Sequence, residues 1–202
     1  VHVSPAVFDI EKLNWVNRNH LKKLSREELI TRARPFLRKS GILPLHPSKE
    51  MLDWAGEVVS ALLKYIDKLD DLEKEVRILV DFIPESDLRA PDVLEILSSK
   101  EARRVIRVFE ENVRALPEGL FDFESYRDTV LKTRDQTGQK GKNLFRPIRI
   151  AITARSSGPD LEHLVPLIDR GSLLDLPRPV AGIRRRVQEV RRSMDRIDFS
   201  DK

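Results

Sequence analysis

The sequence predicts an all-α fold built from packed amphipathic helices. Leu, Ile, Val, Glu, Lys and Arg dominate the composition, whereas aromatic residues make up only 6% and there are 8 glycines, which favours helices over sheets. Apolar residues recur at positions i, i+3 and i+4 in several segments. Serines that can cap a helix precede some of these segments. With 202 residues, 40% of them hydrophobic, the chain can bury one or two small cores.

The first helices are predicted from their caps. In residues 10–24, apolar side chains recur near helical spacing after an extended start. Ser25 and Glu28 then form a capping box, because the serine hydroxyl can accept from the amide three residues on while the carboxylate reaches back. The helix that they open is expected to run to about Arg38 and to end before Gly41.

The clearest core helix follows its expected cap, Ser48. Apolar residues keep helical spacing up to Ile66, so one face should be buried. Another helix is expected over residues 72–83, because Pro84 would end it. Residues 86–91 are expected to form a linker, and the main domain boundary is placed there.

The remaining helices lie after this boundary. Ser98 and Glu101 form a second capping box. Later helices are expected over residues 123–136, in the basic segment that follows, over residues 160–168 and in the C-terminal stretch containing Arg184–Arg186. For these three arginines, contact with phosphate and a solvated helix face are both open interpretations.

Basic residues are concentrated in the last third of the chain. The net charge is +4 overall, but residues 140–202 contain 14 basic and 8 acidic residues, a net charge of +6. Positive potential at one end of a protein attracts polyanions and makes their binding salt-dependent. The charge distribution therefore favours nucleic acid as a partner.

The most specific segment is Gly138–Leu161, GQKGKNLFRPIRIAITARSSGPDL. Its basic side chains, expected to be exposed, are Lys140, Lys142, Arg146, Arg149 and Arg155. A turn at Gly158 and Pro159 follows the amphipathic run. Glycine lets a backbone approach closely, proline fixes a turn and guanidinium groups supply paired hydrogen bonds. The segment predicts contact with a polyanion, and an ordinary solvated basic helix is the alternative.

No catalytic residues and no metal site are predicted. The histidines are scattered without the spacing of a metal-binding pair, and the phosphate-binding patterns GxxxxGK[ST] and GxGxxG do not occur. Cysteine is absent, which is compatible with a reducing compartment, so the cytoplasm is expected. The apolar runs are much shorter than the roughly 20 residues that span a bilayer, so no membrane partner is expected.

Three stretches resemble bacterial glutamyl-tRNA synthetases. KGKNLFRPIRIAIT, at residues 140–153, is similar to the family's KGK-x-LF-x-P-L/I-R-V/I-A-L/I-T. FDIEKLNWVN, at Phe8–Asn17, is similar to FDxxKLxWxN, and residues 25–41 resemble the S-x-E-E-L and PFL-x-x-x-G stretch that lies between these motifs. The three occur in the family's order, so the resemblance extends from about Phe8 to Ile168.

The resemblance implies a fold and a domain organisation. The expected fold is the helical anticodon-binding domain of a class I aminoacyl-tRNA synthetase, with two helical subdomains, as a fragment of a larger enzyme. Residues 1–24 would be the end of the stem-contact domain, residues 25–86 the first helical subdomain and residues 87–202 the second. Because the first residue is Val rather than Met, the natural start is expected to be missing.

The resemblance also implies a function. The parent enzyme would be a glutamate–tRNA ligase that uses ATP and Mg²⁺ to attach glutamate to tRNA(Glu), with tRNA(Gln) as an open second substrate. This region would bind the tRNA as a monomer and select it by its anticodon. It would hold no cofactor or metal itself, and it would be inactive alone because the catalytic domain is absent from these residues.

The matched positions imply individual roles. Arg149 stands where the family's arginine contacts the first anticodon base. Gly158 and Pro159 stand where a residue pair contacts the middle base, and Leu161 would add main-chain contact. Gly158 replaces the Ser or Thr that is common in the family, which removes a hydroxyl.

The third anticodon base is less clearly assigned. EVRILVDF matches the family's R-x-x-T-L-x-E-F and places Glu75 at the reader position, with Arg77 two residues later. A carboxylate can accept from a cytosine amino group but cannot donate. Discrimination between the two tRNAs therefore does not follow from the resemblance.

Two alternatives belong to other classes of protein. A helical protein-interaction module would expose an apolar groove and would bind no tRNA. A stand-alone RNA-binding helical protein would begin near residue 1, and the upstream gene sequence would distinguish it from a synthetase.

Overall fold

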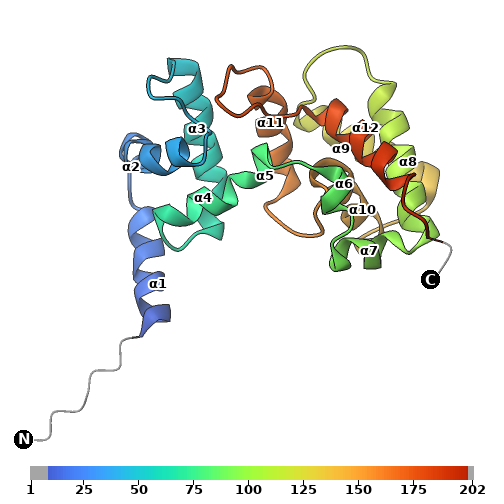
Figure 1. The fold of residues 1–202 in the computed structure, drawn as a ribbon, viewed down its shortest axis with the longest axis horizontal. Coiled ribbons are helices and arrows are strands. Elements are labelled where there is room, and N and C mark those ends of the chain that lie inside the picture. The colour runs from blue at the N-terminus through green and yellow to red at the C-terminus, as the bar shows by residue number, and fades with distance from the viewer. Residues whose placement is uncertain (1–8, 200–202) are drawn as a thin grey trace, which may run out of the picture. The chain divides into compact units, whose positions relative to one another are not determined.

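The computed structural model describes residues 9–199, and the regular structure in this range is helical (Figure 1). No strand occurs among these residues, so the predicted all-α class is confirmed. Residues 1–8 lie outside the described range, together with Phe8 of the FDIEKLNWVN motif and the extended start expected before it. None of the described helices is long and apolar enough to span a bilayer.

The chain divides into two compact units between Val76 and Arg77. This division lies before residues 77–86, which were expected in the first subdomain. Those residues belong to the second unit because the buried side chain of Arg186 donates hydrogen bonds to main-chain carbonyls within them.

The first unit begins with longer helices and continues into short helical turns. Its elements are α1 (Ile10–Leu21), α2 (Arg26–Lys39), α3 (Lys49–Leu62), η1 (Leu63–Tyr65), η2 (Leu69–Asp71) and α4 (Leu72–Glu75). The predicted capping box at the start of α2 is confirmed: the Ser25 hydroxyl accepts from the Glu28 amide at 3.2 Å, and the Glu28 carboxylate accepts from the Ser25 amide at 3.0 Å. The Ser48 hydroxyl caps α3 by accepting from the Met51 amide.

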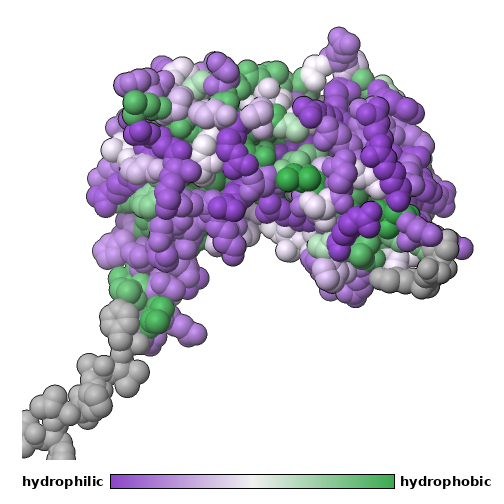
Figure 2. Space-filling view, viewed as in Figure 1, coloured by the Kyte–Doolittle hydropathy of each residue, from purple (hydrophilic) through white to green (hydrophobic). Residues whose placement is uncertain are grey.

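The core of the first unit lies between α2 and α3, which pack against each other. Trp54 of α3 and Leu37 of α2 are buried there. The expected apolar stripe of α1 is not covered in the same way, since Ile10 is 63% and Trp15 60% exposed. Figure 2 shows hydrophobic atoms at the surface near the start of this helix.

The second unit contains the basic segment at its centre. Its elements are α5 (Arg77–Val80), α6 (Pro84–Asp87), α7 (Pro91–Leu97), α8 (Lys100–Arg114), α9 (Phe123–Thr137), α10 (Lys142–Thr153), α11 (Leu161–Gly171) and α12 (Ile183–Met194). α10 packs against α7, α8 and α12, and α8 also packs against α9. One side of α10 is therefore held in the core while the other remains accessible.

The prediction of a single helix over residues 72–83 is wrong. Two short helices, α4 and α5, occupy this stretch. The carbonyl of Val80 cannot continue the helix, since Pro84 four residues later has no N–H. Carbonyls just before Val80 accept from Arg186 instead. The linker expected at residues 86–91 likewise contains the end of α6 and the start of α7.

The cap predicted at the start of α8 is displaced by one residue. The hydroxyl of Ser99, not of Ser98, accepts from the Ala102 amide at 3.2 Å. The Glu101 carboxylate accepts from that hydroxyl at 2.8 Å. Ser98 is instead the C-cap of α7, a helix that the sequence pattern did not predict.

Two of the three arginines on α12 depart from both interpretations offered for them, whereas Arg185 lies on a solvated helix face. Arg186 is fully buried, and its guanidinium carbon lies 4.6 Å from the centre of the Phe82 ring. Arg184 donates to carbonyls at and just after the end of α8. Arg185 is the exposed member and pairs with Glu189 one turn later. Two of the three arginines therefore hold the fold together.

Candidate nucleic-acid interface

Two glycines turn the chain from α9 into α10. Gly138 follows α9 with φ 70°, and Gly141 precedes α10 with φ 53°, which are backbone angles that favour glycine. No side chain caps the first turn of α10. An uncapped helix start beside Lys142 provides positive potential from both the helix dipole and the amine.

The accessible face of α10 combines basic and aromatic side chains. The residues at positions i, i+3, i+4 and i+7 of this face are Lys142, Phe145, Arg146 and Arg149. The ring of Phe145 is 50% exposed, which is unusual for a large apolar side chain. Among residues 9–199, the side chains of Lys142 and Arg146 make no hydrogen bond or ion pair, so their charges are available to a ligand.

The turn after α10 is tied to Arg149, whose Nη1 donates to the Pro159 carbonyl at 2.7 Å. Gly158 in this turn has φ 143°. A Cβ at this position would lie 3.1 Å from Cδ1 of Ile78 and 3.6 Å from Nη1 of Arg149. Backbone angle and space both favour glycine here, which gives a structural reason why no hydroxyl residue occupies the position.

A cavity of about 440 Å³ opens beside Arg149. Its lining residues are Tyr126, Gly141, Lys142, Phe145, Arg146, Arg149, Asp160, Leu161 and Glu162. The lining offers aromatic and apolar surface, two guanidinium groups, an amine and two carboxylates. Such a mixture suits a ligand that has a planar ring and a phosphate. The faces of the ring can stack on the aromatic side chains, and its polar edge can form hydrogen bonds.

The phenol of Tyr126 remains protonated throughout the physiological range. Burial raises its pKa to about 12; the nearby Arg149 guanidinium lowers it, and Glu162 raises it. Tyr126 therefore contributes a neutral ring to the lining, and the charges come from the basic and acidic side chains beside it.

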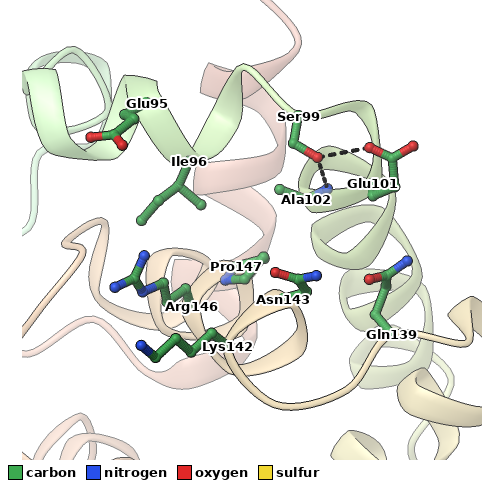
Figure 3. A pocket seen from close by; sticks show the side chains of 10 residues that line it. All are labelled: Glu95, Ile96, Ser99, Glu101, Ala102, Gln139, Lys142, Asn143, Arg146 and Pro147. Atoms are coloured by element: carbon green, nitrogen blue, oxygen red, sulfur yellow. Dashed lines mark hydrogen bonds between the residues drawn. The ribbon is translucent and has the colours of Figure 1, made fainter.

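A second cavity, of about 470 Å³, lies on the other side of the Lys142 and Arg146 pair. Its lining residues are Glu95, Ile96, Ser99, Glu101, Ala102, Gln139, Lys142, Asn143, Arg146 and Pro147. Figure 3 shows Glu95 and Ile96 facing the side chains from α10 across the opening. Hydrogen bonds from its own main-chain amide and from the Ser99 hydroxyl lower the pKa of Glu101, so this carboxylate is ionised at neutral pH.

The sequence model described as "Anticodon binding domain" matches residues 28–175 of the chain. The chain belongs to this family. The matched range contains α10, the turn that follows it and all of the residues that line the two cavities. The helical fold is thus that of an anticodon-binding domain.

Relatives of this anticodon-binding domain include bacterial glutamate–tRNA ligases, as the resemblance implied. The chain is 30% identical over 174 residues to glutamate–tRNA ligase 1 of Caldicellulosiruptor saccharolyticus, covering 86% of this chain and 35% of that protein. It is 32% identical over 171 residues to glutamate–tRNA ligase of Exiguobacterium sibiricum, covering 85% of this chain and 34% of that protein. The chain spans about a third of the length of these relatives.

The fold is shared with a solved structure of a ligase. The crystal structure of a glutamate tRNA ligase from Elizabethkingia meningosepticum in complex with its amino acid superposes with a TM-score of 0.69, at 15% sequence identity. The superposition covers 98% of this chain and 34% of the other. Both helical units therefore have counterparts in that structure.

The anticodon-binding domain brings together part of the predicted residue set. Lys142, Arg146, Arg149 and Leu161 line the cavity beside Arg149. The adjoining turn contains Gly158 and Pro159, and the hydrogen bond from Arg149 to the Pro159 carbonyl connects it to the cavity.

Other predicted residues lie outside this cavity. Lys140 is exposed but lines neither cavity. Arg155, expected on the exposed face, is half-buried and donates to the Asp81 carbonyl at 3.5 Å. Glu75 is in α4 of the first unit and Arg77 begins α5 of the second.

Sequence reasoning missed the aromatic and acidic part of the cavity. Phe145 lies four residues before Arg149, so helical spacing could have placed its ring on the same face. Tyr126 and Glu162 come from α9 and α11, and their approach depends on tertiary packing that no local pattern reveals. No group of His, Cys, Asp and Glu among residues 9–199 is arranged to hold a metal ion.

Proposed function

We propose that this chain is the anticodon-binding part of a glutamate–tRNA ligase, and that it binds tRNA(Glu) and selects it by its anticodon. The observation that carries the proposal is the cavity beside Arg149, which joins an exposed aromatic ring to a guanidinium group within the family-matched segment. Single-stranded bases are recognised by this combination of stacking and edge contacts.

Arg149 is proposed to read the first anticodon base. Its guanidinium has five donors in a planar fork and can pair with acceptors on a base edge. One donor already holds the Pro159 carbonyl, which orients the side chain before RNA arrives. The half-exposed ring of Phe145 offers a surface for the base to stack on.

The middle base is proposed to meet the turn formed by Gly158 and Pro159, together with Leu161 at the start of α11. Gly158 is exposed, so a base can reach its backbone, and the missing Cβ leaves room for Ile78 and Arg149 beside the turn. Recognition at this point would use main-chain groups, because no hydroxyl is present at the position.

The positive charge of the region is proposed to attract the tRNA backbone. The basic side chains at or just before the start of α10 are Lys140, Lys142 and Arg146. Arg155 adds to the positive potential although its side chain is half-buried. Glu75 and Arg77 are proposed to contribute to the third base, with tRNA(Gln) as a second candidate tRNA.

The chemistry of the parent enzyme is proposed to take place outside this chain. ATP and Mg²⁺ would serve the attachment of glutamate to the tRNA there, since the described residues hold neither a phosphate-binding glycine loop nor a carboxylate cluster for Mg²⁺. This chain alone would bind tRNA as a monomer in the cytoplasm without aminoacylating it.

An RNA hairpin with the anticodon stem and loop of tRNA(Glu) tests the proposal. We expect the 202-residue chain to bind it more tightly than a hairpin of equal length with an exchanged anticodon. Affinity should fall steeply between 50 and 200 mM salt, by about tenfold or more if a few phosphates are contacted. Equal affinity for both hairpins, or affinity that salt does not change, would reject the proposal.

A further inference from the structure

The second cavity adjoins the first through two shared basic residues. Lys142 and Arg146 line both cavities, whereas the other lining residues belong to one or the other. The two side chains lie one helical turn apart on α10, about 6 Å along its axis. They therefore stand between two openings, each large enough for a planar ring.

The lining of the second cavity has the composition that a nucleobase requires. Ile96, Ala102 and Pro147 supply apolar surface for the faces of a ring. Polar groups for its edge come from Glu95, Gln139 and Asn143. Among residues 9–199, the polar side-chain atoms of these three residues make no hydrogen bond or ion pair, so their hydrogen-bonding capacity is available to a ligand.

We propose that this cavity receives the nucleotide immediately 5′ of the anticodon, while Lys142 and Arg146 hold the phosphate between it and the first anticodon base. The proposal rests on the proposed function, because it takes the Arg149 cavity as the site of that first base. It adds a contact with a nucleotide that is not part of the anticodon.

The order of the sites along the fold identifies this nucleotide. The turn at Gly158 and Pro159 is assigned to the middle base, and Arg149 beside it to the first base. The second cavity contains neither Arg149 nor Leu161 and adjoins the first only at Lys142 and Arg146. The next nucleotide on the side away from the middle base is the one that precedes the anticodon.

The chemistry of the lining groups fits a base in the cavity and a phosphate at the two cations. The Asn143 amide can both donate to and accept from a base edge, and the Glu95 carboxylate can accept from a ring N–H or an exocyclic amino group. The charges of Lys142 and Arg146 suit the connecting phosphate, since ammonium and guanidinium groups form strong hydrogen bonds with phosphate oxygens.

The test compares two hairpins and three proteins. The hairpins carry the tRNA(Glu) anticodon and differ only in whether the nucleotide 5′ of the anticodon is normal or abasic. The proteins are the unchanged 202-residue chain, Asn143→Ala and the control Gln188→Ala. Asn143 and Gln188 are both exposed on helices, so neither change should disturb folding, which circular dichroism verifies.

We expect the abasic hairpin to bind the unchanged chain and Gln188→Ala about tenfold more weakly than the normal hairpin, because the apolar contacts and the hydrogen bonds of the base are lost together. Asn143→Ala should lose most of this difference. If the abasic hairpin binds as tightly as the normal one, or if the loss is equal in all three proteins, the second cavity does not receive this nucleotide. Either result would leave the proposal of anticodon selection intact. Equal binding of hairpins with cognate and exchanged anticodons would instead reject the function on which the proposal rests.

Discussion

Arg149 both holds the turn after α10 and lines the cavity. Its hydrogen bond to the Pro159 carbonyl, at 2.7 Å, connects α10 to the turn before α11. The same side chain lines the cavity, so the turn and the proposed base reader are fixed relative to each other. A reader held in place before binding loses less conformational freedom when the ligand arrives.

The buried phenol of Tyr126 predicts a stability change at alkaline pH. Its pKa is about 12 in the folded protein and about 10 when unfolded. The folded state thus holds its proton more tightly, and the stabilisation is fully present below pH 10. It should be lost as pH rises from 10 to 12, by about 1.4 kcal/mol per pH unit.

Urea unfolding at several pH values measures this effect on the free energy of unfolding. Tyr126→Phe keeps the ring and removes the titrating group, so its stability should fall less than that of the unchanged chain between pH 10 and 12. Parallel pH profiles for the two proteins would show that the phenol is not protected in this way.

At the scale of elements, α12 secures the segment that supports the turn after α10. The Arg186 guanidinium donates to carbonyls of α5, to Ala181 and to the end of α10. Ile78 of α5 lies beside Gly158. Burial lowers the pKa of Arg186 to about 9, with the charge of Arg155 acting in the same direction, so the group stays cationic at neutral pH.

Arg186→Ala should therefore destabilise the protein strongly. The change removes a charged donor from several buried carbonyls, and we expect the free energy of unfolding to fall by about 3 kcal/mol. Urea denaturation measures it. The matched control is Arg185→Ala, which removes the exposed neighbour on the same helix and should change stability by less than about 0.5 kcal/mol. Similar losses for both variants would contradict the role given to Arg186.

Local sequence patterns predicted the longer elements because their signals are local. Capping at Ser25 and Ser48 depends on residues within one turn, and both caps occur as expected. Carbonyls of α5 accept hydrogen bonds from Arg186, more than a hundred residues later, and apolar spacing could not indicate this contact. The burial of Arg186 was missed for the same reason, since a run of arginines usually marks a solvated surface.

The candidate site was predictable in part. The segment from Lys140 to Leu161 carries its basic residues and its turn in a single stretch of sequence. The cavity itself also needs Tyr126 from α9 and Glu162 from α11, which packing brings to the same place. Composition indicated what kind of partner to expect, and tertiary structure supplied the surface on which it would bind.

At the scale of the whole molecule, charge and proposed function are distributed unevenly. Residues 140–202 carry a net charge of +6 within a chain of net charge +4. The proposed base-reading residues lie in the second unit, apart from Glu75. Long-range attraction by the basic part and short-range reading by α10 would together give both affinity and selection.

The most direct test of the central claim replaces Arg149 with Lys and measures binding to hairpins that carry each of the four bases at the first anticodon position. Lysine keeps the charge but loses the planar fork. We expect the preferred base to bind about tenfold more weakly and the preference among the four bases to disappear, while the salt dependence stays unchanged. Arg192→Lys, an exposed control on α12, should retain the preference. An undiminished first-base preference in Arg149→Lys would contradict base reading by this residue.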